Sequence, residues 1–149
     1  MRLQDSSQFK KIIELSEKIK DIPKGANTIN APLLLRDFVI AIDITTDLLA
    51  NAVRQDSKAH ARLKQAESIA YFDKAPEFLK EKGVRESSDA KKMYVPQDVD
   101  VMEAVDLRGQ TEAMVVFLKN KLQEFRMAHD VVKKIAYSSD YNNSPNEGL

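Results

Sequence analysis

Basic and aromatic side chains alternate in the middle of this chain, from residue 58 to residue 92. Nine Lys and Arg stand there against six Asp and Glu, although the whole sequence has no net charge. Lys or Arg can hold the phosphates of a single-stranded nucleic acid while an aromatic ring stacks under a base, without reading the base sequence. The candidate contact residues are Lys58, Arg62, Lys64, Tyr71, Lys80, Lys82, Arg85, Lys91 and Lys92. A solvated helix face above core aromatics would have the same composition, so this alternative stays open.

Residues for catalysis or metal binding do not occur at the required spacing. His60 and His129 have no second ligand at HxxxH or HExxH spacing, and the chain contains no Cys. Ser87 precedes Ser88 and Asp89 without a nearby histidine, which indicates a helix cap and not a nucleophile. No Walker loop or GxGxxG motif is present. We therefore expect no enzymatic activity, no cofactor and no metal.

Length and composition predict one all-α domain. The chain has 149 residues, of which 43% are hydrophobic and 31% charged. Four Gly and 7% aromatic residues are too few for the turns and strands of a sandwich or barrel. A net charge of zero predicts no bulk attraction to membranes or nucleic acids. The lack of Cys and of an apolar N-terminal stretch fits a cytoplasmic protein.

A short amphipathic helix is expected first, from Ser6 or Ser7 to about Asp21. Residues 22–30 contain Pro23 and Gly25 and predict a hinge loop, so residues 1–29 form an N-terminal arm. The inner face of the helix is predicted to consist of Phe9, Ile12, Ile13, Ser16 and Ile19.

A very long helix should follow, because Asn30 is a good N-cap and no Pro or Gly occurs between Pro32 and Pro76. Residues 33–53 are apolar nearly all round, but four charges within them disfavour a membrane span. Farther along, the apolar seam narrows to small side chains that let helices approach closely, which predicts a coiled-coil hairpin or bundle. This seam consists of Ala52, Ala59, Leu63, Ala66 and Ala70.

Two short helices and a second long helix complete the predicted fold. The short ones cover residues 76–82, ending at Gly83, and 88–94, capped by Ser87 or Ser88. Asp98 should cap the last helix, which is expected to run to Tyr137. The long-helix domain thus spans residues 30–137, and the polar residues 138–149 predict a disordered tail.

The last helix carries apolar residues at steps of three and four, which is the period of one helix face. Together with residues 33–53, this face offers more apolar surface than a few helices are expected to bury among themselves. We therefore expect a homo-oligomer whose interface contains Met114, Leu118, Leu122, Phe125, Val132 and Ile135.

The order of these features resembles that of the UvsY-type recombination mediators of tailed phages. The similar features are a basic helical section with Ala61-Arg62-Leu63, a short polar connector, and an acidic start of a long C-terminal helix at Asp98 and Asp100. In that family, apolar positions at like spacing match Phe117, Leu122 and Ile135 of this chain.

The resemblance implies an all-helical, ring-forming, non-enzymatic protein that binds single-stranded DNA and helps a recombinase to displace a single-strand-binding protein. The family's DNA-contacting segment corresponds here to Ala61, Arg62 and Leu63, with Lys58 and Lys64 nearby. The aromatic pair that follows this motif in the family comes later here, at Tyr71 and Phe72. A viral protein of this kind would act in the host cytoplasm. The alternative is a structural or regulatory helical module that binds other proteins and no nucleic acid.

Overall fold

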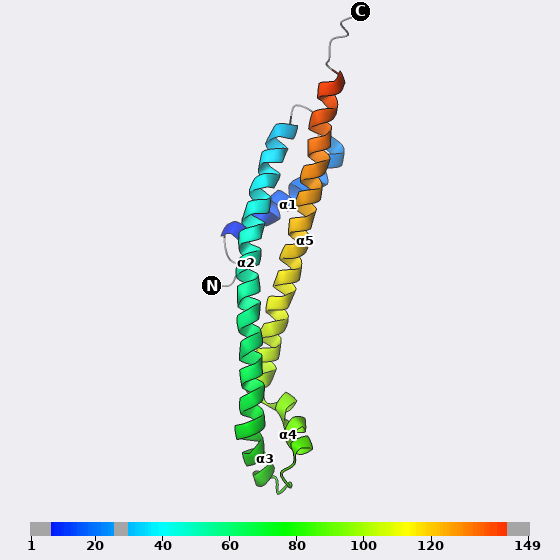
Figure 1. Ribbon diagram of the computed structural model, residues 1–149. Coiled ribbons are helices and arrows are strands. Elements are labelled where there is room, and N and C mark those ends of the chain that lie inside the picture. Colours follow the sequence, from blue (N-terminus) through cyan, green and yellow to red (C-terminus); the bar gives the residue numbers. More distant parts are fainter. Residues whose placement is uncertain (1–6, 26–29, 143–149) are drawn as a thin grey trace, which may run out of the picture. The chain divides into compact units, whose positions relative to one another are not determined.

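The computed structural model of the chain describes residues 7–25 and 30–142, and this part is helical with no strand (Figure 1). Two long helices, α2 (Ala31–Ile69) and α5 (Val99–Asn142), are accompanied by three shorter ones, α1 (Ser7–Gly25), α3 (Ala75–Glu81) and α4 (Ser88–Tyr94). A π-helical turn (Ala70–Lys74) joins α2 to α3, and a 3-10 turn (Val95–Gln97) precedes α5. The predicted all-α fold is confirmed. None of these helices is long and apolar enough to cross a membrane.

The chain forms two compact units. The first unit consists of Met1–Ala50 and Val116–Leu149, and the second consists of Asn51–Val115. Each long helix therefore contributes one part to each unit. Helix α1, which the sequence assigned to a separate arm, belongs to the same unit as the start of α2 and the end of α5.

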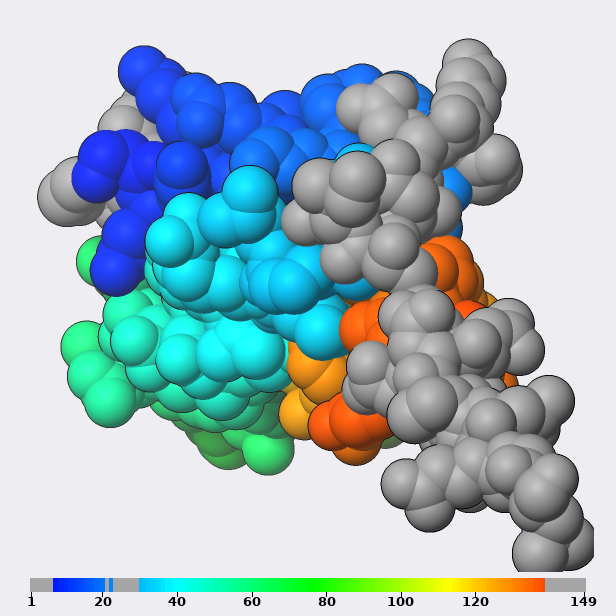
Figure 2. Space-filling view, turned by 90° about the horizontal axis from the view of Figure 1, so that it is seen from above, coloured from blue at the N-terminus to red at the C-terminus, as the bar shows by residue number. Residues whose placement is uncertain are grey.

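The core of the first unit is apolar and comes from three helices. Phe38 of α2 and Phe125 of α5 are fully buried, and their ring centroids lie 6.4 Å apart. From α1, Ile12 and Leu15 are buried, and Phe9 lies with its ring centroid 5.6 Å from that of Phe117 in α5. In Figure 2, α1 (blue) covers one side of the first turns of α2 (cyan). The first unit is thus a three-helix packing.

This packing corrects the expected oligomer interface. Leu118, Leu122, Phe125 and Val132 are buried within the chain, while Met114 and Ile135 are half-buried. Helical periodicity shows that a face must be covered, but not whether the cover comes from the same chain or another. Here α1 and α2 supply it. The apolar surface of these residues therefore gives no reason to expect a second copy.

Helix α1 differs from its prediction in two respects. It runs to Gly25, past the predicted end at Asp21, and the remainder of the predicted hinge, residues 26–29, lies outside the described residues. Of the predicted inner face, Ile12 is buried and Phe9, Ser16 and Ile19 are half-buried, whereas Ile13 is 39% exposed. The sequence analysis left out Leu15, which is buried.

The small-residue seam of α2 is confirmed in the second unit. Ala52, Ala59, Leu63 and Ala70 are buried, and Ala66 is half-buried. Leu63 and Ala70 form a cluster with Val101 of α5, against which Ala104 and Val95 also pack. Small side chains let the backbones of the two helices approach each other closely.

Pro76 shapes the junction between α2 and α3. Proline has no backbone N–H and disturbs the helix one turn before it. The chain absorbs this in the π-helical turn, where the Ala75 N–H donates to the Ala70 carbonyl. As predicted, Gly83 stops α3, because it follows the C-cap residue Lys82 and has φ = 64°. The Gly83 and Val84 amides donate to the Lys80 and Leu79 carbonyls at 3.1 and 2.9 Å, closing a Schellman motif.

The remaining helix ends follow the predicted caps. Ser87 Oγ accepts from the Ala90 N–H at 3.1 Å at the start of α4. Asp98 Oδ1 accepts from the amides of Asp100 and Val101 at 3.0 and 3.3 Å and caps α5. At its other end α5 continues to Asn142, five residues past the predicted end at Tyr137, so residues 138–142 of the predicted disordered tail are helical. Residues 143–149 of the predicted tail lie outside the described residues.

Candidate nucleic-acid interface

All nine candidate contact residues belong to the second unit. Lys58, Arg62 and Lys64 lie on α2, and Tyr71 lies in the π-helical turn. Lys80 is on α3, Lys82 and Arg85 follow it, and Lys91 and Lys92 are on α4. The candidates therefore come from three helices and two connections.

The α2 candidates divide between two sides of the helix. Arg62 and Lys64 are two residues apart, which places them about 200° apart around the helix axis. Lys58 lies one turn before Arg62 and shares its side. A single strand that follows α2 could therefore meet Lys58 and Arg62 together, but not Lys64 with them.

Arg62 borders an open groove between α2 and α5 with a volume of about 490 Å³. Its lining is mixed in charge, because Asp100 and Glu103 of α5 face it beside Arg62 and Lys74. The sequence could not reveal this, since these carboxylates come some forty residues later along the chain. The full lining is Arg62, Gln65, Ala66, Ile69, Lys74, Asp100, Glu103, Ala104 and Leu107.

The second unit as a whole is not basic. Asn51–Val115 contains eleven Lys and Arg and twelve Asp and Glu, a net charge of −1. The local excess of three between residues 58 and 92 is cancelled by the acidic start of α5, which packs against the end of α2 within the same unit. Any nucleic-acid contact must therefore rest on individual cations and not on a broad positive field.

Tyr71 is packed against α4. Its hydroxyl and Ser88 Oγ are 3.1 Å apart in a hydrogen bond, and Lys91 Nζ lies 5.6 Å from its ring centroid. The Phe72 ring meets it edge-on, with centroids 4.9 Å apart. A base could stack on Tyr71 only by displacing these neighbours, so its half-buried ring is a poor platform.

Phe72 is the aromatic residue that the sequence-based selection missed. Its side chain is 67% exposed, whereas Phe78 is half-buried against Tyr94 with ring centroids 4.9 Å apart. An exposed ring at the end of α2 can offer a face to a base. Pro76 was the available signal, because the helical disturbance before it changes the direction of side chains in residues 70–74.

The candidate cations differ in whether they contact a carboxylate or an aromatic ring of the same chain. Lys91 forms an ion pair with Glu86 at 2.5 Å, and Lys82 Nζ lies 5.8 Å from the Phe78 ring centroid. The other six cations are exposed, and within residues 7–25 and 30–142 none of them forms an ion pair. They are Lys58, Arg62, Lys64, Lys80, Arg85 and Lys92.

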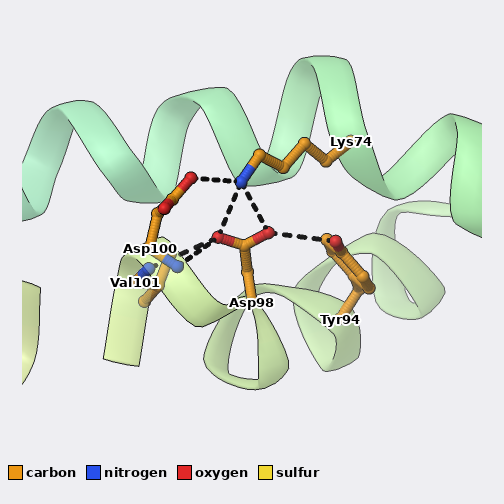
Figure 3. A network of polar contacts seen from close by, with 5 residues as sticks. All are labelled: Lys74, Tyr94, Asp98, Asp100 and Val101. Carbon is orange, nitrogen blue, oxygen red and sulfur yellow. Dashed lines mark hydrogen bonds and ion pairs between the residues drawn. The ribbon is translucent and has the colours of Figure 1, made fainter. Parts of the chain in front are cut away.

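The best-defined polar site of the second unit is the carboxylate of Asp98, which is 4% exposed (Figure 3). Lys74 Nζ donates to its two oxygens at 3.1 and 3.0 Å, and the Tyr94 hydroxyl donates at 3.0 Å. Lys74 also reaches Asp100 Oδ2 at 2.5 Å. Together with the capping amides, these donors satisfy a nearly buried charge.

The surroundings of Asp98 shift three pKa values. Burial alone would raise the pKa of Asp98, but the donors from Lys74, Tyr94 and the Val101 amide outweigh it and hold the pKa below its usual value. Hydrogen bonds to Asp100 and Asp98 raise the pKa of Lys74. Burial, followed by the hydrogen bond to Asp98, raises the pKa of Tyr94. Asp98 is thus held as an ionised acceptor, and its hydrogen bonds join the π-helical turn after α2 to the start of α5.

Neither histidine takes part in this hydrogen-bond network. His60 is half-buried on α2, and His129 Nδ1 on α5 lies 3.5 Å from Asp130 Oδ1. Among the described residues, no group of three or more His, Asp or Glu side chains could hold a metal ion.

Comparison with known proteins gives no relative of the chain: no family model matches it, and neither does any curated protein or solved structure.

Proposed function

We propose that this chain is a non-enzymatic accessory protein that binds single-stranded DNA and acts as a recombination mediator. The observation that carries the proposal is that six of the candidate cations are exposed and form no ion pair within the described residues: Lys58, Arg62, Lys64, Lys80, Arg85 and Lys92. An exposed cation without a carboxylate partner keeps its charge available for a phosphate. Release of the counterions condensed on DNA then supplies binding free energy.

Two further features support the proposal. Lys58 and Arg62 lie one helical turn apart on one side of α2. Arg62 belongs to the segment that resembles the mediators' DNA-contacting motif, and Lys58 lies near it. Phe72 offers an exposed ring at the end of the same helix. Cations along a helix and an aromatic ring at its end match the phosphate-and-stacking mode of sequence-independent strand binding.

The test is a titration of a fluorescent single-stranded oligonucleotide at two salt concentrations. Replacing Lys58 and Arg62 together by Ala should weaken binding, and each lost phosphate contact should flatten the slope of log affinity against log salt by about 0.7. Circular dichroism should show unchanged helicity, because both side chains are exposed.

A matched control removes two exposed cations of the first unit that also form no ion pair within the described residues, Lys10 and Lys134. This double replacement changes net charge equally and should leave binding nearly intact. Equal losses in both variants would indicate non-specific attraction. Wild-type protein that binds no oligonucleotide at low salt would reject the proposal.

A protein-binding helical module is the second candidate. The observation that favours it is a row of apolar residues on the outer side of α2 in the first unit, including Val39, which is 46% exposed. Rows of this kind are typical contact surfaces for another helix.

A further inference from the structure

The outer side of α2 carries a regular row of side chains in the first unit, which is apolar except for Thr46. Its members, spaced by four, three, four and three residues, are Leu35, Val39, Ile42, Thr46 and Leu49, here called the outer seam. Val39 and Thr46 are exposed, and the other three are half-buried. Alternating steps of four and three give a period of 3.5 residues, which is that of a coiled-coil contact.

The outer seam is separate from the side of α2 that forms the core. Phe38, Ala41, Thr45 and Leu48 are buried and face the three-helix packing of the first unit. Four members of the outer seam directly follow a core residue, and the fifth, Leu35, comes three positions before Phe38. These positions place the outer seam on one flank of the core side of α2. Asp37, on the opposite flank, pairs with Lys18 of α1. Helix α1 therefore covers the other flank and leaves the outer seam open.

Three cations on α5 run along one edge of the outer seam, and the exposed carboxylate of Asp130 lies between the last two of them. Lys119, Arg126 and Lys133 are exposed and spaced by seven residues, and Lys133 lines the same hollow as Leu35. Helices α2 and α5 run in opposite directions here, because Leu35 borders the same hollow as Lys133, whereas Phe38, later in α2, packs against Phe125, earlier in α5. Steps of seven on both helices therefore bring Arg126 to the level of Ile42 and Lys119 to the level of Leu49.

Negative charges lie along the other edge. Asp43 and Asp47 of α2 are exposed and stand next to Ile42 and Thr46, on the side away from α5. Within the part of the chain that the structure describes, neither they nor Lys119 and Arg126 form an ion pair. The outer seam is thus an apolar strip with unpaired cations on one edge and unpaired carboxylates on the other.

We propose that this strip binds a second copy of the chain, with the two α2 helices parallel and in register. A twofold axis parallel to the two helices places the cationic edge of each copy opposite the acidic edge of the other. Arg126 and Lys119 of each copy therefore meet Asp43 and Asp47 of the other. An antiparallel pair would instead bring like edges together and place cations against cations. Of the three cations, only Lys133 has no carboxylate opposite it, because the residue on the acidic edge at the level of Leu35 is Arg36.

The test is the molecular mass in solution, measured by light scattering across a concentration series. The wild-type chain should reach at least twice its mass of 16.9 kDa. Val39→Asp should shift it toward the monomer, because a carboxylate in an apolar contact is desolvated without a partner. The matched control is Val131→Asp on α5, since Val131 is also 46% exposed but lies off the outer seam, and it should leave the mass unchanged.

Charge reversal separates this interface from a simple loss of folding. Arg126→Glu and Asp43→Lys should each weaken association, and a chain carrying both should recover it, because each pair is re-formed with its signs exchanged. Circular dichroism should show the same helicity for all three variants. A wild-type monomer, or an assembly that ignores these substitutions, would overturn the proposal.

This inference does not rest on DNA binding, and the two can fail separately. A dimer that binds no oligonucleotide would reject the proposed function alone, and a DNA-binding monomer would reject the α2 interface alone.

Discussion

Lys74 Nζ lies 3.0 Å from Asp98 Oδ2, which ties the end of the long α2 segment to the residue that caps α5. The two residues are 24 positions apart, and the intervening chain contains α3 and α4. One carboxylate thereby fixes a helix start and joins two helices.

Loss of the Asp98 carboxylate should destabilise the fold. Asp98→Ala removes the N-cap of α5, which typically costs about 1 kcal/mol and at most about 2, and it also removes the acceptor for the Tyr94 hydroxyl. Urea unfolding followed by circular dichroism measures the change. Asp100→Ala is the control, because Asp100 is exposed and supplies no cap contact, and it should cost clearly less.

The folded chain should lose stability in acid when the Asp98 carboxylate becomes protonated. The pKa of Asp98 is lowered in the folded chain below its ordinary value of 3.8, so its contribution is present above that pH and is lost as the pH falls through the folded pKa. Urea midpoints measured between pH 5 and pH 2 should decline less steeply in Asp98→Asn. Equal slopes in the two proteins would contradict this assignment.

Two glycines should respond oppositely to replacement by Ala. Gly83 has φ = 64°, so a Cβ strains the Schellman turn and should cost about 1 kcal/mol. Gly109 lies inside α5, and a Cβ there would meet nothing within 4 Å beyond the adjacent residues and the local helix backbone, so Ala should stabilise the helix by about 0.5 to 1 kcal/mol. Thermal melts of the two variants would show shifts of opposite sign.

Replacing a core residue of the first unit should change the folding stability and not the association of copies. Phe125→Ala should cost about 3 to 5 kcal/mol, because it empties a fully buried site beside Phe38. Met127→Ala, at 61% exposure, is the neighbouring control and should cost little. A Phe125→Ala protein that stays equally stable and only changes mass would restore the original view of this face as an interface between copies.

Replacing each of the two adjacent aromatic residues should affect a different property, DNA affinity in one case and folding stability in the other. Phe72→Ala should weaken oligonucleotide binding by about 1 to 3 kcal/mol with little loss of stability, because its ring is exposed. Tyr71→Ala should lower stability, since it removes the contacts to Ser88 and Lys91. If both variants bind as tightly as the wild type, stacking has no part in strand binding.

The sequence by itself determined the helices and most of their ends. Proline, glycine and capping residues act within one or two turns, so Ser87, Asp98 and Gly83 could be placed without knowledge of the rest of the chain. The small-residue seam from Ala52 to Ala70 was equally readable, because its period depends on α2 alone.

Only the tertiary structure decided what covers each face and which charges meet. Leu118 and Phe125 are covered by helices of the same chain, and Asp98 and Asp100 neutralise Lys74 across 24 and 26 positions. Tyr71 is packed while its neighbour Phe72 is exposed. A local pattern fixes which side of a helix is apolar or charged, but the partner on that side is chosen by contacts between residues far apart in the sequence.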